Sequence, residues 1–126
     1  MVIHYNSFGP GAEATREAVR AAGAEAISIQ ADLGTPDGIQ ACIGQLKAKA
    51  PAVDILINNA GSLVKRCALA DYTEPLFDAV MNLNVKSAWF ITQAVTPHMI
   101  AQGSGAVVFV SSIAARNGGG PGATIY

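Results

Sequence analysis

Four short runs of mostly aliphatic residues, separated by segments with helical spacing, constrain the fold of this chain most. The runs cover residues 2–5, 26–30, 53–57 and 105–111. Strands that are buried on both faces read as continuous apolar runs, whereas strands with one solvated face alternate. The order of elements is therefore β-α-β-α-β-α-β. It predicts an α/β fold with a parallel sheet that is covered by helices on both faces.

Helical spacing and terminal signals predict three helices between the strands. They are one that follows Gly9-Pro10-Gly11 and ends at Gly23, one from Thr35 to near Pro51, and one from about Pro75 to Gln102. The chain has 126 residues and shows no internal repeat or linker. Residues 1–126 are therefore expected to form a single domain.

Charge and cysteine content exclude several classes of function. The net charge is −1 without a basic stripe, so neither nucleic acid nor an anionic membrane is an expected partner. No charged residue lies between Lys86 and Arg116, but polar residues, Gly and Pro interrupt this stretch, which therefore predicts a buried helix and strand rather than a membrane span. Cys42 and Cys67 lack metal-ligand spacing, so we expect no metal site and a reducing, cytoplasmic location.

The segment from Gly9 to Ala14 fits the G-x-G-x-x-G/A pattern of dinucleotide-binding turns. Pro10 removes one of the backbone N–H groups that such a turn offers to a pyrophosphate. Residues 5–8 also lengthen the connection between strand and helix. We therefore favour a plain loop and helix start over a nucleotide fingerprint, and keep a different cofactor at this turn as an alternative.

Four features that follow one another in fixed order carry the chemical signal. They are Asn58-Asn59-Ala60-Gly61 after the third strand, Asn84 on the long helix, Ser111-Ser112 after the last strand, and Tyr126. Each has a structural alternative when taken alone. A buried Asn commonly satisfies backbone groups, and a Ser at the end of a strand commonly caps a turn or helix.

Together these motifs closely resemble the short-chain dehydrogenase/reductase family, over essentially the whole chain. The resemblance implies a partial doubly wound parallel sheet, Rossmann-like, that lacks the family's first strand-turn-helix and its C-terminal elements. It also implies an NAD(P)-dependent oxidoreductase that interconverts a carbonyl and an alcohol. In the family the Tyr transfers a proton, the Ser orients the substrate, and the Asn supports a water-linked proton relay; these roles fall on Tyr126, Ser112 and Asn84.

The same resemblance assigns the residues that contact the cofactor. The loop from Asn58 to Gly61 would lie against the adenosine and ribose, and Asp32 with Leu33 would contact the adenine. For Asp32 a plain loop role is an equal alternative without the resemblance. The full expected set is Asn6, Ser7, Asp32, Leu33, Asn58, Asn59, Ala60 and Gly61.

Asn6 and Ser7 bear on the choice of cofactor. An acidic residue after the first strand would hydrogen-bond a ribose 2′-OH and disfavour a 2′-phosphate. The chain has Asn6-Ser7 there and no acid until Glu13, which favours NADP(H) over NAD(H). The family's use of the long helix in subunit contacts suggests a homodimer or homotetramer of the full-length parent, through Trp89 and Phe90, although core packing explains these residues equally well.

The chain departs from the family pattern in three places. The family's first strand with its glycine-rich turn and the Lys four residues beyond Tyr126 have no counterpart, and the interval from Ser112 to Tyr126 is one residue longer than usual. We therefore expect a central fragment, truncated at both ends, that is marginally folded and inactive alone. The substrate would be a small carbonyl or alcohol, with 3-oxoacyl-carrier-protein reduction as one option. The alternative is a non-enzymatic nucleotide-binding or oligomerising module.

Overall fold

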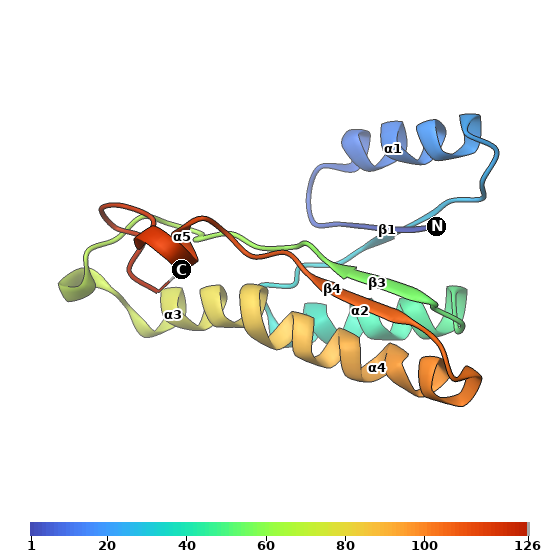
Figure 1. Ribbon diagram of the computed structural model, residues 1–126. Helices are drawn as coiled ribbons and strands as arrows, with labels where there is room; N and C mark the ends of the chain where they lie inside the picture. The colour runs from blue at the N-terminus through green and yellow to red at the C-terminus, as the bar shows by residue number, and fades with distance from the viewer. Residues whose placement is uncertain (126) are drawn as a thin grey trace.

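A computed structural model describes residues 1–125 of the chain (Figure 1). The elements follow the predicted alternation of strands and helices. Their bounds are β1 Val2–Tyr5, α1 Gly9–Ala21, β2 Ile27–Gln30, α2 Pro36–Lys49, β3 Ile55–Asn58, η1 Leu69–Asp71, α3 Glu74–Met81, η2 Asn82–Lys86, α4 Ser87–Gln102, β4 Ala106–Phe109 and α5 Ala114–Asn117. The predicted α/β fold class and parallel strand pairing are confirmed.

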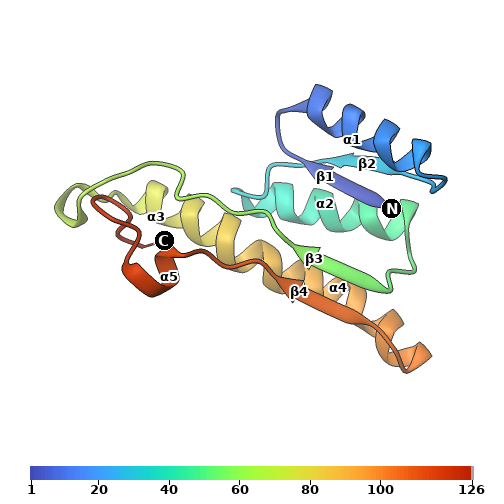
Figure 2. The same cartoon turned by 45° about the horizontal axis from the view of Figure 1, so that its top comes forward.

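The four strands form two separate parallel pairs rather than one sheet. β1 pairs with β2, with Val2 opposite Ile27, and β3 pairs with β4, with Ile55 opposite Ala106. In the described part of the chain no strand joins the two pairs. In two views all four strands run in the same direction, so their carboxyl ends meet at one edge of the molecule (Figures 1 and 2).

Helices cover the pairs unequally. α1 packs on β1 and β2, and α2 lies on the opposite side of this pair, where it contacts β2 and α4 (Figure 2). The core therefore lies between α2, α4 and the strands, with Ile29, Ile39 and Val95 among its buried residues. α4 covers one face of β3 and β4.

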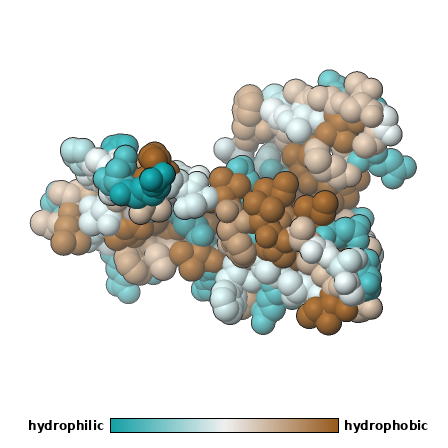
Figure 3. All heavy atoms as spheres, viewed as in Figure 1, coloured by the Kyte–Doolittle hydropathy of each residue, from teal (hydrophilic) through white to brown (hydrophobic). Residues whose placement is uncertain are grey.

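The opposite face of β3–β4 carries exposed aliphatic side chains. Strand pairing places Ile55, Ile57 and Val108 on this face, with exposures of 65%, 61% and 45%. Figure 3 shows apolar side chains gathered in the middle of the molecule, over these strands. The low charge content thus leaves an uncovered apolar face as well as a buried core.

The predicted helix starts and stops are largely confirmed. α1 begins at Gly9 itself with Pro10 in its first turn, so the segment from Gly9 is a helix start. Thr35 caps α2, because its hydroxyl oxygen accepts a hydrogen bond from the Gly38 N–H at 3.1 Å. Three features were not predicted: the 3₁₀ turn η1, the short α5 in the glycine-rich loop, and the π-helical turn η2 within the long helix.

Candidate functional site

A small cleft at the carboxyl ends of β3 and β4 brings together most of the predicted site residues. Its volume is about 270 Å³. Loops end both strands here, and the turn η2 forms the opposite wall. The predicted residues that line it are Asn58, Asn59, Ala60, Gly61, Asn84 and Ser112. Residues separated by up to 54 positions in sequence thus converge at one place, as expected for the carboxyl edge of a parallel sheet.

Asn84 ties the loop after β3 to the long helix. Its amide nitrogen Nδ2 donates to the Ser62 carbonyl at 2.7 Å and to the Val80 carbonyl at 2.8 Å, and Oδ1 accepts from the Ser62 N–H at 3.1 Å. The loop approaches closely, since a Cβ added to Gly61 would lie 2.9 Å from Asn84 Oδ1. The side chain of Asn84 therefore holds the loop in position and leaves little free donor capacity.

Asn84 lies inside η2, a π-helical turn of five residues from Asn82 to Lys86. Such turns are rare in proteins and occur frequently at functional sites. A second Asn of the same turn, Asn82, faces elsewhere and donates to the Gly34 carbonyl at 3.2 Å. The two asparagines thus fix the helix to two loops, one after β2 and one after β3.

Ser112 lies at the other wall of the cleft. Its Oγ accepts a hydrogen bond from the Ala114 N–H at 3.2 Å. Ser112 thus caps the turn that follows β4, which is the structural alternative that the sequence allows. The hydroxyl hydrogen stays available for another acceptor, because Ser carries one donor besides its lone pairs. Ile125 also lines this cleft. Tyr126, the predicted proton donor, lies outside the described residues.

Asn58, the first residue of the motif, has a structural contact of its own. Its side chain is half-buried and donates to Thr92 Oγ1 of α4 at 3.0 Å. Asn59 and Ala60 are exposed, and the Asn59 amide makes no side-chain hydrogen bond in the part of the chain that the structure describes. Asn59, Ala60 and Gly61 thus leave the loop surface open to a flat ligand.

The remaining predicted cofactor residues lie outside this cleft, at the carboxyl ends of β1 and β2. Asn6 and Asp32 are neighbours there, with Asn6 Nδ2 3.4 Å from Asp32 Oδ1, and Ser7 is exposed. Asp32 Oδ1 also accepts from the Gly34 N–H at 2.9 Å, which is the plain loop role that the sequence allows for this residue. The Leu33 side chain packs in the core at 3% exposure, so only its backbone could reach a ligand.

Sequence patterns gave no sign of Arg66, which organises the glycine-rich loop after α5. Its guanidinium donates to the carbonyls of Pro121 at 2.8 Å and Gly119 at 3.3 Å. The adjacent Cys67 N–H donates to the Gly122 carbonyl at 3.0 Å, and Thr124 Oγ1 donates to the Cys67 carbonyl at 2.9 Å. These partners are mainly backbone groups, which leave no signature in side-chain patterns.

Within residues 1–125 no three His, Cys, Asp or Glu side chains are grouped so that they could hold a metal ion. Over the same residues, none of the helices has both the length and the apolar character needed to cross a bilayer.

Comparison with known proteins identifies the family. The profile described as short chain dehydrogenase matches residues 2–126. The chain belongs to this family. It is 42% identical over 106 residues to the 2-dehydro-3-deoxy-D-gluconate 5-dehydrogenase of Escherichia coli (strain K12), a match that covers 83% of this chain and 42% of that protein. The 3-oxoacyl-[acyl-carrier-protein] reductase FabG of Staphylococcus epidermidis is 33% identical over 126 residues, which is 100% of this chain and 51% of the reductase.

Solved structures of short-chain dehydrogenases share the fold. An NADH-dependent reductase, A1-R′, complexed with NAD superposes with a TM-score of 0.81 at 32% identity, covering 99% of this chain and 55% of that one. A metagenomic short-chain oxidoreductase in complex with NADP gives 0.79 at 30% identity, covering 92% and 52%. The chain thus spans about half the length of the relatives it matches.

Proposed function

We propose that these residues contribute to an NAD(P)(H)-dependent oxidoreductase that interconverts a carbonyl and an alcohol. The observation that carries the proposal is the cleft in which the loop from Asn58 to Gly61, Asn84 and Ser112 meet. A nicotinamide cofactor is supported by the NAD and NADP complexes among the similar structures. When bound, it would supply or accept the hydride.

The residues at the cleft match what hydride transfer to a carbonyl requires. Negative charge builds on the carbonyl oxygen, so a hydrogen-bond donor and a proton donor must lie beside it. In this proposal the Ser112 hydroxyl donates to that oxygen and the Tyr126 phenol supplies the proton. Asn84 holds the loop that faces the cofactor and supports the proton path. The cofactor-facing residues are Asn59, Ala60 and Gly61, with Asn6, Ser7 and Asp32 toward the adenosine end.

The decisive experiment transplants residues 1–126 in place of the matching half of the Staphylococcus epidermidis reductase, which they match over their full length. We expect the chimera to oxidise or reduce a nicotinamide cofactor with a carbonyl–alcohol pair. Ser112→Ala and Tyr126→Phe should each lower kcat/KM by about 10²- to 10⁴-fold. Ser111→Ala is the matched control, because Ser111 lies beside Ser112 and has no assigned role. Equal activity of the Ser112→Ala and Ser111→Ala chimeras would refute the role of Ser112.

The relatives support two classes of substrate. The match to FabG spans the whole chain and supports a 3-oxoacyl thioester. The higher identity to the gluconate dehydrogenase supports a sugar acid. Assays of two chimeras, one built on each relative, with a 3-oxoacyl thioester and with a keto sugar acid separate the two, because only a preference that both chimeras share can come from residues 1–126. A cytoplasmic location and a homodimeric or homotetrameric parent remain part of the proposal, and the 68% exposed Trp89 is the side chain that favours subunit contact.

The non-enzymatic alternative is a nucleotide-binding or oligomerising module. It is favoured by the two unjoined strand pairs, because a divided sheet presents edges to other chains. Nucleotide binding by the 126-residue chain, together with no activity in the folded chimera, would support the module.

A further inference from the structure

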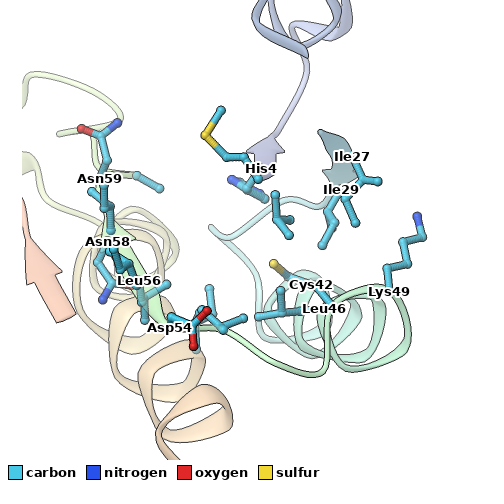
Figure 4. Close-up of a pocket in the computed structure, with 18 of the residues that line it drawn as sticks. His4, Ile27, Ile29, Cys42, Leu46, Lys49, Asp54, Leu56, Asn58 and Asn59 are labelled. Carbon is cyan, nitrogen blue, oxygen red and sulfur yellow. The ribbon is translucent and has the colours of Figure 1, made fainter. Parts of the chain in front are cut away.

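The loop after β3 and the glycine-rich loop after α5 lie side by side beyond the carboxyl ends of β3 and β4 (Figures 1 and 2). Asn59 leads from the end of β3 into the first of these loops (Figure 4). Further along, Cys67 forms an isolated parallel bridge with Ala123 of the second loop. We name the contact of residues 66–67 with residues 119–124 the loop junction.

The backbone of the glycine-rich loop is costly to hold in one conformation. Its left-handed glycines, with φ between 68° and 78°, are Gly118, Gly119, Gly120 and Gly122. Residues with a side chain rarely adopt this region, and glycine loses more conformational freedom on folding than any other residue. Contacts from outside the loop must offset that entropy. The loop junction supplies such contacts.

Arg66 is the side chain that contributes most to the loop junction. Its Nη1 donates to the Pro121 carbonyl at 2.8 Å and to the Gly119 carbonyl at 3.3 Å. Hydrogen bonds from a charged donor are about twice as strong as neutral ones. The approach is close, since a Cβ added to Gly122 would lie 3.1 Å from the Cβ of Arg66. Within residues 1–125 no carboxylate pairs with Arg66, so its guanidinium is directed to these carbonyls.

The end of the loop junction leads directly into the candidate site. Thr124 Oγ1 donates to the Cys67 carbonyl at 2.9 Å. The next residue, Ile125, lines the same cleft as Ser112. Tyr126, the proposed proton donor, follows Ile125 in the sequence. The bonds of the loop junction therefore fix the chain immediately before the proposed proton donor.

The loop after β3 is also fixed at its other end. Asn84 bonds to both backbone groups of Ser62, to the N–H at 3.1 Å and to the carbonyl at 2.7 Å. Residues 62–67 thus connect the long helix and the proposed cofactor-facing loop with the segment before Tyr126. A displacement at Arg66 is therefore transmitted to that segment.

We propose that Arg66 is a positioning residue of the proposed oxidoreductase. By holding the carbonyls of Gly119 and Pro121, it sets where the Tyr126 phenol meets the substrate oxygen beside Ser112. The inference rests on the proposed function, because Arg66 acts through Tyr126 and does not touch the reacting atoms. A small misplacement of a reacting group can lower a rate by up to about 100-fold, so an exposed loop contact of this kind affects the chemical step.

The test is a double-mutant cycle in the staphylococcal reductase chimera, assayed with NADPH and a 3-oxoacyl thioester. Arg66→Met keeps the aliphatic stem and removes the donors to both carbonyls. We expect it to lower kcat about tenfold, while the KM of the thioester and the Kd of NADPH change by less than about twofold. In the Tyr126→Phe background the same substitution should lower kcat no further, because the phenol through which Arg66 acts is absent.

Matched variants separate positioning from a general loss of structure. Arg66→Lys keeps a charged donor and should restore most of the lost kcat. Lys65→Met is the control, because Lys65 is the exposed neighbouring cation and no carboxylate within residues 1–125 pairs with it. It should leave kcat unchanged. If Arg66→Met does not fold, Thr124→Val removes one bond of the same loop junction and should lower kcat about threefold, again only when Tyr126 is present.

The outcomes distinguish this inference from the proposed function. An inactive chimera, or a Tyr126→Phe variant with unchanged kcat, would refute the proposed function and the role of Arg66 with it. If Tyr126→Phe lowers kcat, two results refute the role of Arg66 alone. One is an Arg66→Met effect that is absent or equal in both backgrounds. The other is an equal loss in Lys65→Met, which would assign the effect to surface charge.

Discussion

At the scale of single residues, Asn84 is the best example of one side chain with two interpretations. Its position in an apolar helical stripe allowed either a structural or a catalytic role. Three hydrogen bonds to backbone groups now show the structural role directly. They fix the loop that lines the proposed site, so the same contacts would also position a ligand. Its part in a proton relay stays a prediction.

Replacement of Asn84 tests how strongly it holds the loop. Asn84→Asp keeps the shape but removes both Nδ2 donors and places a carboxylate against the Ser62 and Val80 carbonyls. We expect a loss of about 2 kcal/mol in the free energy of unfolding, measured with urea on the chimera, because each lost hydrogen bond contributes about 1 kcal/mol. Asn82→Asp removes a single bond and should cost about half as much. An equal cost for both variants would contradict the anchoring role.

Asp32 shows how folding changes an inference about the cofactor. The sequence offers no acid directly after the first strand, and this favoured NADP(H). The fold nevertheless places the Asp32 carboxylate 3.4 Å from the Asn6 amide, next to the same position. A carboxylate there would repel a 2′-phosphate. The Asp32 charge therefore opposes the proposed preference for NADP(H).

Asp32→Asn tests this charge in the chimera described above. It keeps an oxygen that can accept from the Gly34 N–H, so the loop should persist. We expect the Kd of NADPH to fall about fivefold while that of NADH changes little, since removing one negative charge stabilises a nearby phosphate by about 1 kcal/mol. Fluorescence titration of each cofactor provides the comparison. A similar change for both would show that Asp32 does not lie near the 2′ position.

At the scale of elements, α2 contains two glycines in contrasting environments. A Cβ on Gly38 would lie 1.8 Å from the Asp32 carbonyl oxygen, whereas a Cβ on Gly44 would meet nothing within 4 Å. Helix propensity favours Ala at both positions by about 1 kcal/mol. The close approach of α2 to the loop after β2 should therefore outweigh helix propensity at Gly38 but not at Gly44.

The pair Gly38→Ala and Gly44→Ala separates propensity from packing. We expect Gly44→Ala to raise the free energy of unfolding by up to about 1 kcal/mol. Gly38→Ala should lower it by about 1–3 kcal/mol, the usual cost of overpacking. Thermal and urea unfolding of the chimera with each substitution give the answer. Stabilisation by Gly38→Ala would mean that α2 does not approach the Asp32 carbonyl so closely.

A polar contact joins the end of α4 to the start of β3. Gln102 Nε2 donates to Asp54 Oδ1 at 2.9 Å, and His98 Nε2 lies 3.5 Å from the same oxygen. Together they hold the pKa of Asp54 below its usual range; the Gln102 hydrogen bond is the larger cause, and desolvation partly opposes the shift. Because the folded pKa is depressed, the stabilisation exists above the unfolded pKa and is lost as the pH falls through the folded one.

The pH prediction distinguishes the two partners of Asp54. We expect Gln102→Ala to raise the pKa of the Asp54 carboxyl further than His98→Ala does, in a carboxyl NMR titration of the folded chain between about pH 2 and 6. Asp54→Asn should remove the corresponding acid-dependent part of the stability. A larger effect of His98→Ala would make charge, rather than the amide hydrogen bond, the main cause.

At the scale of the whole molecule, the two strand pairs lie on either side of a hollow between β1 and β3 (Figure 4) rather than along a common edge. α1 with β1 and β2 connects to the remainder mainly through α2. Unpaired strand edges and the exposed Ile55–Ile57 face lower the stability that one continuous sheet would provide. The chain also covers only 42% of the E. coli relative and 51% of the staphylococcal one.

We therefore expect the 126-residue chain alone to be marginally stable and inactive. Purified chain with NADPH and a reactive ketone should show no turnover above the rate without protein, and its urea midpoint should be low. The chimera assayed in parallel shows that the assay works. Turnover by the isolated chain that is abolished by Ser112→Ala would contradict this expectation.

The sequence by itself determined the order of elements, the starts of the helices and the motifs of the family, because these depend on local patterns of apolar residues, caps and short polar signatures. Thr35 is an example of a cap, the apolar run of residues 53–57 is an example of a strand, and Ser112 belongs to a short polar signature. Only the tertiary structure decided which residues meet: Asn84 on the Ser62 backbone, Arg66 on the glycine-rich loop, and Asp32 beside Asn6. Contacts with backbone groups and unpaired strand edges depend on chain packing, and side-chain patterns do not encode them.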